Sequence, residues 1–441
     1  MSNIEPTDAE VASPVPKKMS TGYVIAGISG NILEWFDFGI YSYFAVAIAA
    51  NFFPKNDDPI VALMNTFMVF GLGFLARPIG GFLFGHFGDR IGRKNTLSIT
   101  VVLMGVSTFA IGCLPSYSQV GVASTMILVV LRVCQGISAG GEWGNVISFL
   151  GEFSKPGNRG FIVSFSQVGS AVGLLIGSLL GLLLSTTMAP EDLNGWGWRV
   201  PFLLGIAIAV FGWFMRRSVD ETPVFKEKQE NQELVAIPMV EAFRSHWKTM
   251  IAVFLVTAGG FTAYWLILSY MPTYFQTFLD TSPQDAYLLS SLTLVGYGII
   301  LPISGILADK YGRKPIMLIG AIGIIVLSYP IVSVLASTNI LGLRILMVMM
   351  LAMIYGLMNS AFTSAMPESF PAKVRVSGVS IPYNLGSALF GGTCSYVATW
   401  LISSNDNNPM MLPIYIIIMM CVSLLSLIFL IKETVHKDYS A

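Results

Sequence analysis

Charged residues are scarce in this sequence. Only 11% of its 441 residues are Asp, Glu, Lys or Arg, against about 25% in an average soluble domain. A soluble chain of this length needs far more polar surface to cover its core, so the shortage excludes an ordinary globular protein. The 25 basic and 25 acidic residues balance, which leaves no general attraction to nucleic acids.

Cysteine and histidine are also rare. Each cysteine lies in an apolar stretch without a CxxC pair, which indicates packed small hydrophobes rather than disulfides or metal ligands. The four are Cys113, Cys134, Cys394 and Cys421. The three histidines lie in loops or tails, and neither a nucleophile–base set nor a GxxxxGK[ST] phosphate loop is present. These absences argue against an enzyme and an ATP-driven pump, and we expect no cofactor.

Apolar residues make up 54% of the chain, and they fall into runs. A run of about 20 apolar residues spans a bilayer as a helix. Six such runs lie in the first half, at about 22–49, 60–86, 97–115, 122–149, 161–186 and 200–217. Six lie in the second half, at about 249–279, 285–308, 315–335, 342–366, 378–402 and 411–431. The pattern predicts an all-α polytopic membrane protein with twelve transmembrane helices.

The basic residues lie on one side of this predicted topology. Most of the 25 fall in the two tails or in every second loop, and cytoplasmic loops carry excess Lys and Arg. We therefore expect both termini and the central loop in the cytoplasm. The predicted segments are a disordered tail 1–19, a six-helix bundle 20–217, a linker 218–247, a second bundle 248–432 and a tail 433–441.

The two halves of the chain repeat each other. The segment Gly85–Lys94, with the pattern GxxxDRxGRK, recurs in part as Gly305–Lys314, 220 residues later. A glutamate and an arginine seven residues apart also occur in each half, as Glu152 with Arg159 and Glu368 with Arg375. Duplicated bundles are common in transporters, whose solute site lies between the halves near the midplane.

This motif, its repetition, the twelve spans and the long central loop resemble the major facilitator superfamily. Within it, the chain is similar to the metabolite:proton symporters, among which are bacterial proline/betaine transporters. The segments that carry this likeness are Gly30–Phe38, Arg77–Gly81, Gln135–Glu142, Trp196–Phe202 and Glu221–Pro223. The resemblance implies two pseudo-symmetric six-helix bundles, proton-driven transport by alternating access, and a place in the bacterial cytoplasmic (inner) membrane.

Ionisable residues inside the predicted spans cluster in the first half. Each costs at least about 2.5–3.5 kcal/mol at the centre of a bilayer, so it needs a partner or a role. Glu34 and Asp37 are three residues apart on span 1 and share a helix face. We interpret them as a proton-coupling site, because burial favours the protonated carboxyl. The alternative is a structural ion pair with Arg132 or Arg77.

Arg132 is the predicted partner of a substrate carboxylate, because its planar guanidinium binds carboxylates with two hydrogen bonds. Gln135 lies on the same face of span 4. The alternative for Arg132 is a permanent bridge to an acid on span 1. Glu142 either completes this network or lies near the cytoplasmic end of span 4. We interpret Arg77, followed directly by Pro78, as mainly structural.

Uncharged polar and aromatic residues on four other spans are candidates to line a solute path. The predicted substrate-binding residues among them are Gln167, Tyr264, Trp265, Asn359, Tyr383 and Asn384, and Tyr355 and Thr363 are further path residues. The rings of Tyr264 and Trp265 are suited to hold a quaternary ammonium by cation–π attraction. The alternative is ordinary packing or anchoring at the membrane interface.

The resemblance implies that the repeated motif forms a latch, which stabilises the outward-facing state. The predicted gating residues are Arg77, Asp89, Arg90, Arg93, Glu142, Glu152, Arg159, Asp309 and Arg313. In this interpretation Asp89 interacts with a nearby helix N-terminus, where negative charge is favoured. Asp309 and Arg313 are the counterparts in the second half.

The function predicted from the sequence is secondary active transport, as proton-coupled symport of a small organic solute such as proline or glycine betaine. A di- or tricarboxylate is the alternative solute. A drug or metabolite exporter and a channel are alternatives of other classes, which the resemblance and the duplicated gating motif disfavour. The expected partners are the solute, protons and the lipid bilayer, and we expect the chain to work as a monomer.

Overall fold

All regular structure in the part of the chain described below is helical. The computed structural model describes residues 21–54, 58–91, 93–140, 146–147, 150–151, 154, 157–207, 210, 214, 238–371 and 374–435. Within these ranges, the side chains of 21–30, 85–91, 93–97, 238–240 and 242 are not described. No strand occurs in these ranges, as expected for a chain that crosses lipid with every backbone hydrogen bond satisfied internally.

The first half contains ten described helical elements. They are α1 (Thr21–Tyr43), α2 (Ala45–Phe52), α3 (Pro59–Ile91), α4 (Arg93–Cys113), α5 (Tyr117–Val120), α6 (Val122–Ala139), α8 (Arg159–Thr187), α9 (Pro190–Asp192), η1 (Leu193–Gly197) and α10 (Arg199–Leu203). The second half contains nine. They are α13 (Pro238–Leu268), α14 (Met271–Phe278), α15 (Pro283–Tyr311), α16 (Arg313–Ser337), α17 (Leu341–Glu368), α18 (Arg375–Gly386), η2 (Ser387–Gly391), α19 (Cys394–Ser403) and α20 (Met411–Phe429).

These helices account for the twelve predicted spans. In the described ranges, nine helices are long and apolar enough to cross a membrane, and the bent pair α1 and α2 makes a tenth. A shorter apolar helix, Ser98–Cys113, covers the third predicted span. The sixth begins as α10 at Arg199, and most of its remaining residues lie outside the described ranges.

Two spans expected as single helices are broken, and a third contains an irregular turn. In span 1, the helix bends by 63° between its two parts, because Phe44 leaves helical geometry with φ −97° and ψ 20°. Span 7 breaks before α14, where Pro272 in the first turn lacks the N–H that a continuous helix needs. Span 11 contains the π-helical turn η2 in its middle. Helix α13 begins at Pro238, inside the predicted linker, and kinks at His246.

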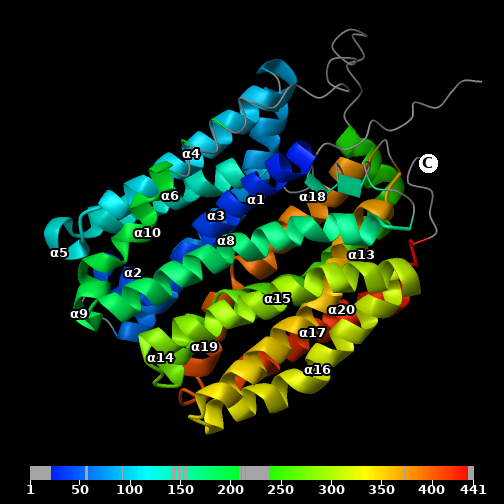
Figure 1. Ribbon diagram of the computed structural model, residues 1–441. Coiled ribbons are helices and arrows are strands. Elements are labelled where there is room, and N and C mark those ends of the chain that lie inside the picture. Colours follow the sequence, from blue (N-terminus) through cyan, green and yellow to red (C-terminus); the bar gives the residue numbers. More distant parts are fainter. Residues whose placement is uncertain are drawn as a thin grey trace, which may run out of the picture.

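The two halves form two bundles that meet along α8 and α15, which run side by side through the middle of the molecule (Figure 1). Helices α1 to α10 form one bundle, and α13 to α20 form the other. Besides α15, helix α17 of the second bundle also packs against α8. This arrangement places α1 and α8 of the first half beside α13, α15 and α17 of the second.

Glycines let α3 and α6 approach closely in the first bundle. A Cβ on Gly136 would lie 1.8 Å from the carbonyl oxygen of Gly73, and a Cβ on Gly80 would lie 1.9 Å from that of Ile137. No side chain fits in these gaps, so the two backbones are in direct contact. Arg77 of α3 and Arg132 of α6 both face acids of α1.

Candidate functional site

A small, partly open cavity lies between the two bundles. Eleven residues line it: Trp35, Gln167, Thr257, Gly260, Phe261, Tyr264, Tyr355, Asn359, Phe362, Thr363 and Tyr383. The first half contributes only Trp35 from α1 and Gln167 from α8. The other nine belong to α13, α17 and α18 of the second half. None of the eleven is Asp, Glu, Lys, Arg or His, so the wall is aromatic with uncharged polar groups.

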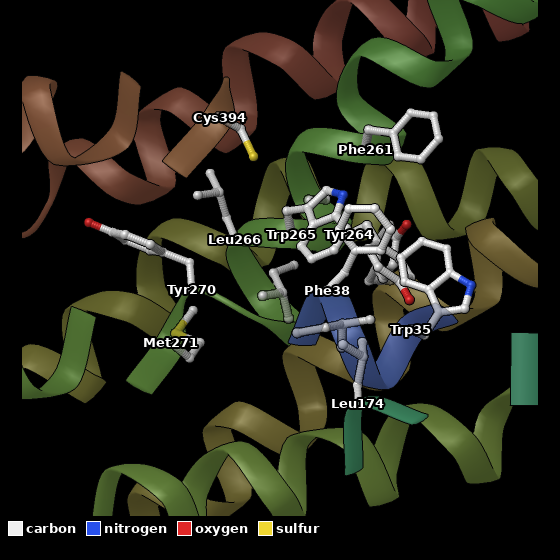
Figure 2. Close-up of a cluster of buried hydrophobic side chains, with 14 of the residues drawn as sticks. Trp35, Phe38, Leu174, Phe261, Tyr264, Trp265, Leu266, Tyr270, Met271 and Cys394 are labelled. Atoms are coloured by element: carbon white, nitrogen blue, oxygen red, sulfur yellow. The ribbon is translucent and has the colours of Figure 1, made fainter. Parts of the chain in front are cut away.

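Aromatic rings pack against one another around this cavity, in tilted and edge-to-face contacts. The ring of Trp35 lies 4.9 Å from that of Tyr264 between centroids, across the boundary between the halves (Figure 2). Phe261 and Tyr383 make a similar contact at 4.8 Å. The indole N–H of Trp35 donates to Asn31 Oδ1 over 2.9 Å.

Asn31 in turn ties α1 to α8. Its amide nitrogen donates to the carbonyl of Ser166 over 2.5 Å and to the Ser170 hydroxyl over 2.9 Å. Because the same side chain also accepts from the Trp35 indole, it fixes both the helix pair and the orientation of that ring. The aromatic wall is therefore held in place before any solute arrives.

Glu34 forms a buried ion pair with Arg77. A guanidinium nitrogen of Arg77 lies 2.6 Å from Glu34 Oε1, and both side chains are 1% exposed. The pair joins α1 to α3. Its two charges balance each other within the buried pair.

Asp37 lies in a looser network with Arg132. Arg132 Nη1 is 4.0 Å from Asp37 Oδ2, and Gln135 mediates between them. Its Oε1 accepts from Arg132 over 2.7 Å, while its amide nitrogen donates to Asp37 Oδ1 over 2.8 Å. The hydroxyl of Thr108 donates to the same Oδ1. Within the described residues Asp37 Oδ2 accepts no hydrogen bond.

Aromatic rings surround the Arg132 guanidinium. Its central carbon lies 4.1 Å from the ring centroid of Tyr41, 5.3 Å from that of Phe70 and 5.4 Å from that of Phe38. Cation–π attraction offsets part of the cost of burying this charge. Arg132 is not among the residues that line the cavity.

The predicted substrate residues thus fall into two groups. Gln167, Tyr264, Asn359 and Tyr383 line the cavity. The other four lie outside the lining: Arg132, Gln135, Trp265 and Asn384. Trp265 packs among phenylalanine rings, with Phe70 and Phe74 each 5.1 Å away. Asn384 donates to the carbonyl of Gly140 on the first half over 3.2 Å.

Five residues that line the cavity were not among the predicted path residues. They are Trp35, Thr257, Gly260, Phe261 and Phe362. Trp35 stands between the two acids of span 1, and its bulk in the middle of a span was the available signal. The others look like ordinary apolar or small residues of a transmembrane helix, and only the packing of the two bundles reveals them.

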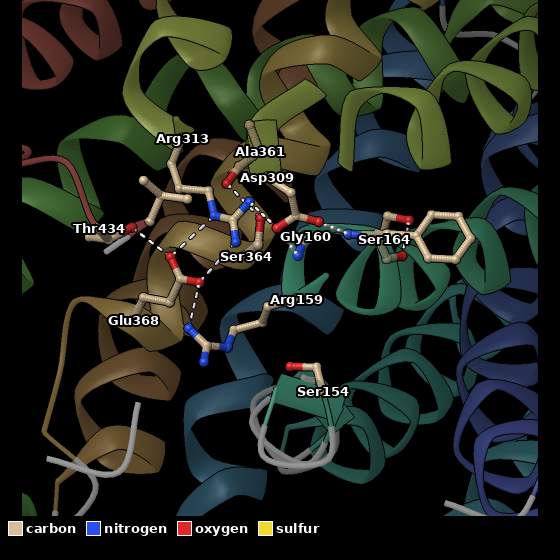
Figure 3. A network of polar contacts seen from close by, with 12 residues as sticks. Ser154, Arg159, Gly160, Ser164, Asp309, Arg313, Ala361, Ser364, Glu368 and Thr434 are labelled. Atoms are coloured by element: carbon tan, nitrogen blue, oxygen red, sulfur yellow. Dashed lines mark hydrogen bonds and ion pairs between the residues drawn. The ribbon is translucent and has the colours of Figure 1, made fainter. Parts of the chain in front are cut away.

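On one side of the cavity, a charged network joins the halves. We call this side the motif end, defined by Arg159, Asp309, Arg313 and Glu368. The two carboxylate oxygens of Asp309 accept from the backbone N–H groups of Gly160, over 2.8 Å, and Phe161, over 2.9 Å (Figure 3). Asp309, at the end of α15, therefore caps the N-terminus of α8 in the other half, where negative charge is favoured.

Two arginines share Glu368 at the motif end. Arg313 contacts Glu368 over 3.0 Å and Asp309 over 2.7 Å, and Arg159 of the first half contacts Glu368 over 3.1 Å. The hydroxyl of Thr434 also donates to Glu368, over 2.7 Å. Three predicted gating residues, Arg159, Asp309 and Arg313, are thus brought together in one network (Figure 3).

Glu433 closes the N-terminus of α16 at the same end. Four backbone N–H groups donate to its carboxylate, those of Arg313, Lys314, Thr434 and Val435. Burial raises the pKa of this carboxyl, but the four donors lower it by more, so the pKa stays below its usual range. The segment after α20 is thereby fixed beside the Arg313 network.

Contacts between the halves also occur on the other side of the cavity. We call this side the opposite end, defined by Tyr43, Leu268, Ser178 and Ser291. The Tyr43 hydroxyl donates to the carbonyl of Leu268 over 3.0 Å. The hydroxyls of Ser178 on α8 and Ser291 on α15 are 2.9 Å apart.

The remaining predicted gating and network residues lie outside the described part of the chain. Glu142 and Glu152 are not described at all, and the side chains of Asp89, Arg90 and Arg93 are not described. Arg77, also predicted as a gating residue, pairs with Glu34 as given above. The first copy of the motif therefore stays a prediction.

Two helical bundles around a central cavity, with inter-bundle contacts on both sides of it, define a polytopic membrane transporter. Comparison with known proteins agrees. The sequence pattern of the Major Facilitator Superfamily matches residues 27–382. The chain is 35% identical over 424 residues to the glycine betaine/proline/ectoine/pipecolic acid transporter OusA of Dickeya dadantii, covering 94% of this chain and 83% of that protein.

Other relatives support the same assignment. The chain is 34% identical over 381 residues to the citrate-proton symporter of Klebsiella pneumoniae, covering 86% of this chain and 85% of that protein. The structure resembles the partially occluded inward-open xylose transporter XylE from E. coli, with a TM-score of 0.73 and 20% identity, covering 95% and 99% of the two chains.

This chain belongs to the major facilitator superfamily. It has the all-helical fold of that superfamily, and it is a multi-pass membrane protein. The comparisons confirm the resemblance seen in the sequence and the prediction of a secondary transporter of small solutes rather than an enzyme.

Proposed function

We propose that the chain is a proton-coupled symporter of a zwitterionic osmolyte, with proline and glycine betaine as the leading solutes. One observation carries this proposal: the cavity wall is aromatic and contains none of the residues Asp, Glu, Lys, Arg or His among the described residues that line it. A solute without net charge suits such a wall, because an unpaired buried charge is costly.

Each end of a zwitterion has suitable partners in this wall. The faces of Trp35, Tyr264 and Tyr383 suit the cationic end, at about 0.5–2 kcal/mol for each cation–π contact. The amide of Asn359, which donates one of its two hydrogens to the Tyr297 hydroxyl, has a second one that suits the carboxylate. The relative OusA, named for transport of glycine betaine, proline, ectoine and pipecolic acid, supports this choice of solute.

Citrate is the second solute to weigh, because a citrate-proton symporter is 34% identical. Three carboxylates in a buried site call for several cations around them. The nearest guanidinium groups are already engaged, Arg77 with Glu34 and Arg132 with Gln135 and aromatic rings. We therefore favour the zwitterion.

We assign the coupling proton to Asp37. Its Oδ2 accepts no hydrogen bond within the described residues, and Arg132 stays 4.0 Å away. A proton on Oδ2 would therefore break no existing hydrogen bond. Glu34, in contrast, contacts Arg77 over 2.6 Å, and protonating it would leave a guanidinium buried without its counter-charge. In this proposal Glu34 and Arg77 form a fixed ion pair.

The motif end then acts as a latch, which opens and closes as the two bundles rock around the cavity. The Asp309 cap on α8 and the Arg159–Glu368 pair, both between the halves, support this role.

We place the motif end and both termini on the cytoplasmic side of a bacterial inner membrane, from the positive-inside pattern. One chain supplies the whole cavity, which supports a monomer.

Uptake into proteoliposomes with an imposed pH gradient tests the proposal. We expect the wild type to accumulate proline and glycine betaine when the outside is acidic, and citrate far less. Asp37→Asn mimics the protonated carboxyl, so it should abolish accumulation driven by the gradient and keep exchange of labelled for unlabelled solute. Gradient-driven accumulation by Asp37→Asn at the wild-type level would refute the coupling role, and preferred uptake of citrate would refute the zwitterion.

A further inference from the structure

The orientation of the Gln167 side chain is fixed by its neighbour across the cavity. The hydroxyl of Thr363 donates its hydrogen to the carbonyl of Asn359, over 2.8 Å. A hydroxyl has one hydrogen, so Thr363 Oγ1 acts as acceptor toward Gln167, 3.0 Å away. The amide nitrogen of Gln167 must therefore face Thr363, which directs its carbonyl oxygen Oε1 elsewhere.

That oxygen has no partner. Gln167 lines the cavity and is only 4% exposed, yet its Oε1 accepts no hydrogen bond within the described residues. A buried acceptor left without a donor is unfavourable and rare in folded proteins. Its place in the cavity wall indicates that a donor arrives with the solute.

Tyr264 presents the complementary group from the other half. It also lines the cavity, its side chain is buried, and its hydroxyl has no partner among the described residues. Its ring contacts those of Trp35 and Tyr355, which fix its position. The cavity thus has an unpaired acceptor on the first bundle and an unpaired donor on the second.

We propose that Gln167 and Tyr264 recognise an amino acid zwitterion, and that Gln167 Oε1 makes the chain prefer solutes whose ammonium carries N–H groups, such as proline, over glycine betaine, which it also accepts. Gln167 Oε1 accepts from the ammonium, and the Tyr264 hydroxyl donates to the carboxylate. A secondary ammonium, as in proline, supplies the missing donor. A quaternary ammonium has no N–H and leaves Oε1 unpaired. The inference rests on the proposed function and names the specificity-determining residue in its cavity.

A series of methylated prolines isolates this one contact. Proline has two N–H groups in its zwitterion, N-methylproline has one, and N,N-dimethylproline has none, while the carboxylate and ring stay the same. Uptake of each is measured in proteoliposomes as kcat/KM, for the wild type, Gln167→Met and Tyr264→Phe. Methionine keeps the length of the glutamine side chain and removes its acceptor.

We expect the wild type to prefer proline over dimethylproline. Gln167→Met should lower kcat/KM for proline by about 10- to 100-fold, the usual worth of a hydrogen bond to a charged group, and leave dimethylproline within about twofold. Tyr264→Phe should lower uptake of all three solutes alike, because they share the carboxylate. Normal uptake of dimethylproline by Gln167→Met also demonstrates that the variant folds.

Two results would refute the role of Gln167 and leave the proposed function, symport of a zwitterion, unaffected. One is wild-type uptake of dimethylproline as efficient as that of proline, which is decisive even where Gln167→Met does not fold. The other is an equal loss of proline and dimethylproline uptake in Gln167→Met, which would give the residue a purely structural role. Failure of the wild type to take up any of the three solutes would instead refute the proposed function, and this inference with it.

Discussion

The guanidinium groups of Arg77 and Arg132 both lie within 5.5 Å of the Phe38 ring centroid, yet the two arginines contact their carboxylate partners on α1 in different ways. Glu34 contacts Arg77 directly, whereas Asp37 meets Arg132 through Gln135. The sequence identified all four charged residues, because ionisable groups in apolar spans stand out. Which acid pairs with which arginine depends on how α1 lies against α3 and α6, and no local pattern encodes that.

The Glu34–Arg77 pair should behave as a structural unit. Arg77→Gln leaves the Glu34 carboxylate buried without its counter-charge, which should lower the free energy of unfolding by about 3–5 kcal/mol. The double variant Glu34→Gln/Arg77→Gln removes both charges and should be more stable than the single one. Thermal unfolding of the purified proteins, followed by the fluorescence of their tryptophans, measures the difference. A double variant less stable than Arg77→Gln would contradict the assignment.

Among the helices, α8 depends on the other bundle for its N-terminal cap. Asp309 of α15 supplies both acceptors for the first N–H groups of α8, so the end of one helix and the start of another are bonded across the halves. Any rocking of the bundles that opens the motif end must break these bonds. The cap thus links a local helix property to the state of the whole transporter.

Asp309→Asn should therefore slow transport more than it weakens solute binding. Asparagine keeps one acceptor oxygen but loses the charge that favours the helix N-terminus and pairs with Arg313. We expect the maximal uptake rate to fall by about 10-fold or more, as for loss of a charge-assisted hydrogen bond, with solute affinity changed less. The same substitution at the start of α15, Asp285→Asn, is the matched control and should be silent. Unchanged turnover in Asp309→Asn would exclude the latch.

The helices themselves were largely predictable from the sequence, because a run of apolar residues long enough for the bilayer has few alternatives. Their breaks were not. Neither Phe44, where span 1 bends, nor the π-helical turn Ser387–Gly391 contains a proline. These breaks are set by tertiary packing, such as the close approach of Gly71 on α3 to Gly392 after η2.

At the scale of the whole molecule, the duplication in the sequence predicted the two bundles, but not how unequally they share the site. The first half holds the two charged pairs beside α1, Glu34 with Arg77 and Asp37 with Arg132, and the second supplies nine of the eleven cavity residues. Arg132, the predicted carboxylate ligand, packs against aromatic rings and is not in the lining. Composition reveals that charges are buried, and only the packing of both halves reveals which of them reach a cavity.

Transport by rocking bundles requires the opposite end to separate in part of the cycle. The hydroxyls of Ser178 and Ser291 are 2.9 Å apart, on two helices of different halves. Cysteines at these positions lie close enough for a disulfide with little movement of the backbone. The double variant Ser178→Cys/Ser291→Cys should lose uptake under oxidising conditions and regain it with a reductant. Each single variant, which keeps the native cysteines, should transport under both conditions.

A covalent bond at this place distinguishes a moving interface from a fixed one. If the bundles rock, the oxidised double variant is held with its opposite end closed, so it should still bind solute from the motif end while net uptake is lost. If α8 and α15 stay together throughout the cycle, the disulfide restricts no movement that transport needs, and uptake continues at the wild-type rate. Since the same two helices also meet through Asp309 at the motif end, normal uptake by the cross-linked protein would mean that the pair is a static spine and that other helices gate the cavity.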